Sequence, residues 1–117
     1  MQQALSMTGS AKTEASLERS LLRKAKELGW LIRKVQWIGR SGAPDRLFVR
    51  NGQVVFIELK REGGWLRQEQ WREARALRAQ GVVVRAADTL SDALKVLDNP
   101  NAPPTACETR TEEKWRL

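Results

Sequence analysis

Asp45, Glu58 and Lys60 are the residues whose types and spacing most clearly indicate chemistry in this sequence. The pair Asn51-Gly52 separates two apolar runs, and such a pair is typical of a two-residue hairpin turn. The register of that hairpin places Asp45 directly across from Glu58, with Cβ atoms about 4.5–5.5 Å apart. Lys60 lies two residues beyond Glu58 and therefore projects from the same face of the sheet. Two facing carboxylates beside a lysine predict a divalent-metal site, and such a site suits the hydrolysis of phosphodiester bonds.

A structural ion pair is the competing interpretation. A carboxylate at the end of a buried strand needs a partner, and either Lys60 or Arg46 would serve Glu58. A Glu-x-Lys sequence alone would favour that ion pair. The second carboxylate, Asp45, which follows the conformationally restricted Pro44, favours the metal site instead.

The charge of the chain favours an anionic partner. The 117 residues carry a formal net charge of +7 with an isoelectric point near 10.3. The residues from 98 onward have four acidic and three basic side chains, so the preceding part carries +8. Such a basic domain suggests nucleic acid as the partner. A basic face kept for solubility is the alternative, but it does not explain the facing carboxylates.

Residue types that are missing exclude several chemistries. Without histidine or tyrosine, the chain cannot form a Ser-His-Asp triad, an HNH-type nuclease site, a histidine zinc site or a tyrosine-linked strand-transfer site. The single Cys107 cannot form an intramolecular disulfide and is expected to be incidental. No apolar run approaches the ~18 residues of a membrane span, and no signal-peptide pattern is visible. We expect a soluble protein with no membrane partner, in the cytoplasm of a bacterium or a phage-infected host cell.

Apolar periodicity and turn residues predict an α/β domain with the element order α-β-β-β-α-β-α. The last strand should run parallel to the Glu58 strand, which gives a mixed sheet flanked by helices. Both faces of the hairpin are apolar near its turn, so Val54 is expected to be buried. The expected segments are a flexible arm (1–13), a helix to about 28, a strand (30–38), a loop (39–44), the hairpin (45–59), a helix (65–80), a strand (82–87), a helix to 97 and a flexible, Pro-containing tail (98–117).

Two polar residues interrupt otherwise apolar helix faces. Glu18 shares a face with Leu21 and Ala25, and Gln70 shares one with Ala74. Each has an ordinary explanation, because an acid suits the first turn of a helix and a boundary glutamine can bond to backbone. Together with the facing carboxylates, both are candidates for the same site.

These residues form a recognisable pattern. Pro44-Asp45…Glu58-Leu59-Lys60 resembles the PD-(D/E)XK signature of the restriction-endonuclease-like nucleases. With Glu18 in the first helix and the segments 42–46 and 66–70, the order resembles the VRR-NUC family, in its stand-alone phage and bacterial form. The resemblance covers roughly residues 14–97. Arg67 departs from it, since family members often have serine or a similar residue there.

The resemblance implies roles for these residues. Asp45 and Glu58 would be the principal ligands of Mg²⁺ or Mn²⁺, with the Leu59 carbonyl and Glu18 as further ligands. Lys60 would orient or deprotonate the attacking water, and Gln70 would hold Lys60 or the water. Gln68 is the alternative to Gln70 as the glutamine of the motif.

The expected substrate is DNA. Arg40 and Ser41 precede Asp45 and are placed to contact phosphates, and further basic residues could extend that track: Arg33, Lys34, Arg61, Arg67 and Arg72. Trp37 and Trp65 could stack on an unpaired base, but we assign them to the core. The resemblance implies a structure-selective endonuclease that cuts four-way (Holliday) junctions as a homodimer. A nuclease for flap or linear DNA, and a basic DNA-binding module without cleavage activity, are the alternatives.

Overall fold

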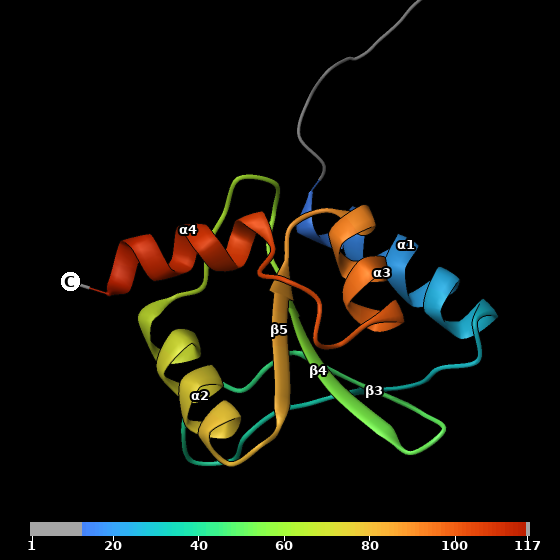
Figure 1. Ribbon diagram of the computed structural model, residues 1–117, viewed down its shortest axis with the longest axis horizontal. Helices are drawn as coiled ribbons and strands as arrows, with labels where there is room; N and C mark the ends of the chain where they lie inside the picture. The colour runs from blue at the N-terminus through green and yellow to red at the C-terminus, as the bar shows by residue number, and fades with distance from the viewer. Residues whose placement is uncertain (1–12, 117) are drawn as a thin grey trace, which may run out of the picture.

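A four-stranded mixed sheet with two helices on each side forms the molecule. The computed structural model describes residues 13–116, so the arm predicted for 1–13 lies, except for Thr13, outside the described residues. The elements are α1 (Glu14–Glu27), β2 (Leu31–Lys34), β3 (Arg46–Arg50), β4 (Gln53–Leu59), α2 (Gln68–Ala79), β5 (Val83–Ala87), α3 (Leu90–Asp98) and α4 (Ala106–Trp115). The sheet order is β2-β3-β4-β5, with α1 and α3 on one side and α2 and α4 on the other (Figure 1). The predicted element order is confirmed through α3, and α4 is an additional helix.

The first helix forms as its sequence predicts. The Thr13 hydroxyl accepts a hydrogen bond from the Ser16 N–H at 3.0 Å and so caps the helix. Leu17, Leu21 and Ala25 form one buried stripe, which packs with β4 and α3 in the main core. This packing brings the N-terminal part of α1, with Glu18, to the open end of the hairpin, away from its turn, where Asp45 and Glu58 lie.

The hairpin has the predicted turn and register. Asn51 and Gly52 have φ angles of 50° and 80°, as a type I′ turn requires. The antiparallel pairing runs from Arg50 opposite Gln53 to Arg46 opposite Ile57. Asp45 immediately precedes β3 and therefore meets Glu58, as expected. Strand β5 lies parallel to β4, which confirms the predicted crossover through α2.

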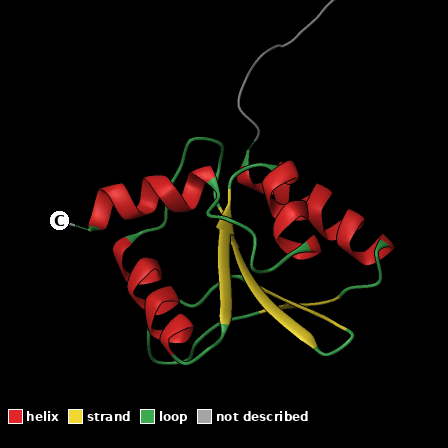
Figure 2. Cartoon of the chain, in the orientation of Figure 1, coloured by secondary structure: helices red, strands yellow, loops and turns green. Residues whose placement is uncertain are grey.

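Two expectations about the sheet are wrong. The strand predicted for 30–38 ends at Lys34, because the chain then leaves the sheet and the Trp37 indole N–H donates to Glu73 of α2 at 2.6 Å. Val54, expected to be buried, is 46% exposed. The hairpin extends beyond the helices at this end, so no helix covers it (Figure 2).

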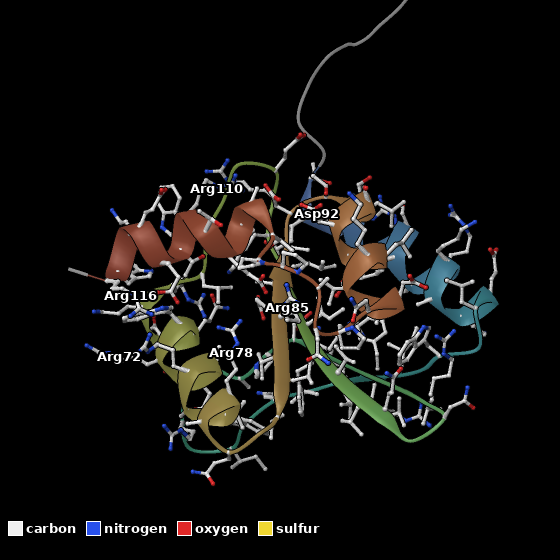
Figure 3. All side chains as sticks on the ribbon, in the orientation of Figure 1. Arg72, Arg78, Arg85, Asp92, Arg110 and Arg116 are labelled. Carbon is white, nitrogen blue, oxygen red and sulfur yellow. The ribbon has the colours of Figure 1, made fainter. Side chains whose placement is uncertain are left out.

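The segment expected to be a flexible tail contains α4, and its packing explains why. Arg85 of β5 is only 8% exposed, and its guanidinium donates to both carboxylate oxygens of Glu108 at 2.8 Å. The same guanidinium donates to the carbonyls of Pro100 and Pro103, so it also fixes the Pro-containing stretch. Arg78 of α2 reaches toward β5 and donates to the Val84 carbonyl at 2.8 Å (Figure 3).

Cys107 lies in the first turn of α4 and is fully buried, and burial raises the pKa of its thiol to about 12. The thiol therefore stays protonated and belongs to the small core between α4 and β5. No helix within residues 13–116 is long and apolar enough to cross a membrane.

Candidate active site

Most of the predicted site residues line one polar cleft. Its volume is ≈ 610 Å³, and it opens at the end of β4 between the first turns of α1 and α2. The residues that line it are Glu14, Ala15, Glu18, Lys34, Ala43, Asp45, Glu58, Lys60, Arg67 and Gln70. The end of β4, the loop before β3 and the N-termini of α1 and α2 therefore meet at this cleft.

Glu58 is the centre of this arrangement. One of its carboxylate oxygens accepts the backbone N–H of Asp45 at 2.9 Å. The other accepts the side-chain amide of Gln70 at 3.1 Å and lies 3.6 Å from the Lys60 ammonium. Glu58 is 7% exposed, so these contacts compensate for most of the hydration that it loses.

Gln70 is fixed from both ends of its amide. Its carbonyl oxygen accepts the backbone N–H of Arg67 at 2.9 Å, while its N–H₂ group donates to Glu58. The first of these bonds satisfies an otherwise free donor at the start of α2. The structure thus places Gln70 in the cleft, whereas Gln68 is not among the residues that line it.

Asp45 and Glu18 occupy the more open side of the cleft. The Asp45 carboxylate lies 3.9 Å from the Lys34 ammonium and 3.8 Å from the Arg46 guanidinium. The Arg46 Nε–H donates to Glu18 at 2.9 Å. Of the two ion pairs considered for Glu58 from the sequence, the one with Lys60 forms, while Arg46 pairs with Glu18 instead.

The carboxylates influence one another electrostatically. Burial, followed by the Glu18 carboxylate, raises the pKa of Asp45. Burial, followed among the raising influences by the negative charge of Asp45, raises the pKa of Glu58. The hydrogen bond from Arg46 lowers the pKa of Glu18, so Glu18 is the one carboxyl of these three whose pKa lies below its ordinary value. This group of acids accumulates negative charge that a bound cation would relieve.

Two known proteins match this chain over nearly their whole length. A solved structure of a "VRR_NUC domain" superposes with a TM-score of 0.69 at 30% sequence identity, and the match covers 75% of this chain and 98% of that domain. "Putative nuclease p44" of Acyrthosiphon pisum secondary endosymbiont phage 1 is 34% identical over 88 residues, with 73% of this chain and 95% of the phage protein covered. The chain belongs to the VRR-NUC family of nucleases. No protein-family model matches the sequence.

The donor set of this VRR-NUC protein fits a hard divalent cation. Oxygen ligands from a few carboxylates are what Mg²⁺ and Mn²⁺ prefer, and Asp45, Glu58 and Glu18 supply them in one cleft. Within residues 13–116, no three acidic, histidine or cysteine side chains already converge on a single point. Lys34, Arg46 and Lys60 form ion pairs with these carboxylates. Leu59, whose backbone carbonyl is the expected ligand, is not among the cleft residues, and its side chain belongs to the core.

The predicted phosphate contacts of this VRR-NUC protein are only partly at the cleft. Arg67 lines it, while Arg61 lines an adjoining hollow. Arg40 pairs with Glu73 at 3.2 Å, outside the cleft, and Ser41 is exposed beside it.

Glu14 and Ala43 are cleft residues that the sequence analysis misses. Glu14 lies one helical turn before Glu18, and residues at this spacing lie on the same face of a helix, so the sequence could have indicated it. Ala43 belongs to the recognised segment 42–46, but its small side chain carries no chemical signal of its own.

Proposed function

We propose that this VRR-NUC nuclease is a metal-dependent endonuclease that hydrolyses phosphodiester bonds in DNA. The observation that carries the proposal is the set of contacts at Glu58. A buried carboxylate meets the backbone of a second acid, a fixed glutamine amide and a lysine 3.6 Å away, within one polar cleft. An ion pair alone would not need the second carboxylate or the glutamine.

The residues divide into cation ligands and groups that act on the phosphate. Asp45, Glu58 and Glu18 would hold Mg²⁺ or Mn²⁺, which supplies a more acidic water and neutralises charge on the phosphate oxygens. Lys60 would orient the attacking water and stabilise the negative charge that develops on the phosphate. Gln70 bonds to Glu58, so its contribution is to fix that carboxylate rather than to hold Lys60.

We further propose that the substrate is branched DNA, with the four-way junction as the preferred form, cut by a homodimer. The basic domain suits the DNA backbone, and within residues 13–116 there is no separate domain for reading sequence, which favours recognition of DNA shape. Symmetric cleavage of a junction needs two active sites related by a twofold axis. Strand β2 forms an open edge of the sheet; its first residue, Leu31, is 49% exposed, and Leu28 at the end of α1 is 50% exposed. This unpaired edge, with its two exposed leucines, is the surface that a second copy would cover.

The test of the activity is cleavage of a four-way junction, a flap and a linear duplex in Mg²⁺, Mn²⁺ or EDTA. We expect both metals to support cleavage, the junction to be cut fastest, and EDTA to stop the reaction. Lys60→Ala should lower the rate at least 100-fold, whereas Lys95→Ala, on the exposed side of α3, should leave it unchanged.

Each other outcome has a definite meaning. DNA that is bound but uncut in both metals would contradict the nuclease proposal for this cleft and support a binding module. Faster cleavage of flap or duplex DNA would contradict the junction preference alone. For the dimer, light scattering should show two copies per particle, and Leu31→Glu should convert them to monomers.

A further inference from the structure

Trp65 is exposed in a way that its assignment to the core does not allow. The side chain is 43% exposed, in the connection between β4 and α2, so that assignment is wrong for this residue. Trp65 lines a second hollow of ≈ 330 Å³ together with Glu14, Lys60, Arg61 and Gly64. Glu14 and Lys60 also line the candidate active-site cleft, so the two hollows adjoin.

The backbone on both sides of Trp65 is fixed by α4. The Arg110 side chain donates to the Gly64 carbonyl at 3.2 Å. The Leu66 N–H donates to the Thr111 hydroxyl at 3.0 Å, and the Leu66 carbonyl accepts the Trp115 indole N–H at 2.7 Å. Figure 1 shows this loop passing beside the first half of α4. The backbone that carries the indole is therefore fixed before any ligand arrives, which reduces the entropic cost of binding.

The other four tryptophans have clear structural roles. Trp30 is 4% exposed and packs edge-on against Phe48. Trp37, Trp71 and Trp115 donate their indole N–H groups to protein acceptors. The Trp65 indole has no such acceptor among residues 13–116. With 43% of the side chain exposed, the ring is available to a ligand from outside the domain.

The charges around Trp65 suit a nucleotide. Lys60 and Arg61 line the hollow with it, and the Lys114 ammonium lies 5.3 Å from the centre of its ring. An aromatic ring beside cationic side chains is the usual platform for single-stranded nucleic acid, because the base stacks and the phosphate is neutralised.

We propose that Trp65 stacks on an unpaired base of the DNA strand beside the scissile phosphate, and that Arg61 contacts the phosphate of that nucleotide. This inference rests on the proposed function, since it takes the adjoining cleft as the place of cleavage. It adds a reason for structure selectivity, because a base in a continuous duplex is not free to leave its stack. At a branch point the stack of bases is interrupted, so a base there is freer to leave it than a base within a continuous duplex.

The experiment measures binding and cleavage separately, with the full-length protein. Binding is measured with 2-aminopurine placed at single unpaired positions of a flap and of a junction carrying unpaired nucleotides, in Ca²⁺ without turnover. The variants are Trp65→Ala, Trp65→Phe and, as an exposed apolar control on the far end of the hairpin, Val54→Ala. Thermal unfolding checks that each variant is folded.

We expect the wild type to quench 2-aminopurine at one unpaired position, and Trp65→Ala to lose that quenching. Its affinity for the unpaired substrates should fall about 5- to 150-fold, the range for one base stacked on an aromatic ring. Trp65→Phe should stay within about threefold of the wild type, because phenylalanine retains a stacking face. Val54→Ala should bind and cut as the wild type does, and the affinity of Trp65→Ala for a fully paired duplex should change less than twofold.

Equal binding by the wild type and Trp65→Ala, or an equal loss on duplex and unpaired DNA, would overturn the stacking proposal while leaving cleavage intact. If the wild type binds and quenches but never cuts, the proposed nuclease function fails and the stacking site stands. The two failures are therefore distinguishable.

Discussion

Replacing Glu108 by alanine should destabilise the whole domain, although the sequence alone predicts a flexible tail for the segment that contains this residue. Glu108 is 8% exposed and binds the Arg85 guanidinium through both carboxylate oxygens at 2.8 Å. It also accepts the backbone N–H groups of Ala86 and Thr105 at 2.9 and 2.8 Å. The Ala86 bond matters because β5 is an edge strand, and Glu108 occupies the side of it that no other strand pairs.

The magnitude follows from what Glu108→Ala leaves behind. The guanidinium of Arg85 would remain buried without its carboxylate, and removal of one partner of a buried pair costs about 3–5 kcal/mol. Two backbone N–H groups would also lose their acceptor, which places the expected loss toward the upper end of that range. Small domains have about 5–15 kcal/mol of stability in total, so this one change would remove a large part of it.

Urea denaturation followed by circular dichroism measures the loss. With a slope of about 2 kcal/mol per molar urea, the midpoint should fall by roughly 1.5–2.5 M. Glu113→Ala, an exposed acid on the same helix, is the control and should shift the stability by less than about 0.5 kcal/mol. If Glu108→Ala does not fold, Glu108→Gln retains the shape and should lose about half as much. A loss below 1 kcal/mol in the alanine variant would refute the claim that this ion pair attaches α4 to the sheet.

Three further results are expected. Gly42→Ala should lower the free energy of unfolding by about 1–3 kcal/mol and slow cleavage, because Gly42 has a φ of 97° and an added Cβ would lie 2.5 Å from a backbone carbonyl of α2. Its matched control in the same urea and cleavage assays is Gly39→Ala, since Gly39 has a φ of 82° but no atom within 4 Å of an added Cβ. Gln70→Ala should lower kcat at least tenfold with little change in KM, since it frees the carboxylate of Glu58; an unchanged kcat would remove Gln70 from the site. Burial raises the pKa of Glu108, but its bonds from Arg85 and two backbone N–H groups outweigh this and hold the pKa below its ordinary 4.5. A carboxylate with a lowered folded pKa stabilises the protein fully above pH 4.5 and loses that contribution as the pH falls through the folded value. Urea midpoints measured from pH 6 to pH 3 should therefore converge for the wild type and Glu108→Gln, and a constant gap would contradict this assignment.

The predictable part of the site is the part that local rules determine. The turn at Asn51-Gly52 fixes the hairpin register, and the register alone brings Asp45 to Glu58. Helical spacing likewise places Glu18 and Gln70 on inward faces. The partner of Arg46 could not be predicted this way, because its pairing with Glu18 depends on how α1 packs across the sheet.

The segment after Asp98 contains a sequence pattern that predicts α4, but its Asn and Pro residues favoured a flexible tail instead. Asn and Pro residues near 100 favour a linker, yet Thr105-Ala-Cys-Glu108 has the spacing of a capping box, and both of its hydrogen bonds form. Arg85 within an otherwise apolar strand also required a buried partner. No sequence pattern identifies Arg85 and Glu108 as partners, so their pairing is known only from the structure.

This attachment has a consequence for catalysis as well as for stability. The loop from Lys60 to Arg67 carries groups of both hollows, and within it the backbone of residues 64 and 66 bonds to α4. Asp88, at the end of β5, accepts the Gly63 N–H and pairs with Arg110, which ties the same loop to the sheet.

The site is thus held from β4 on one side and from α4 on the other. Loosening α4 without unfolding the domain should leave Asp45 and Glu58 in register, because the hairpin turn sets them, yet release the loop that carries Trp65 and leads into α2. Thr111→Val, which removes only the hydroxyl that accepts the Leu66 N–H, is the smallest such change. It should impair cleavage more than it lowers the free energy of unfolding, and the opposite ranking in parallel cleavage and urea assays would mean that α4 only stabilises the fold.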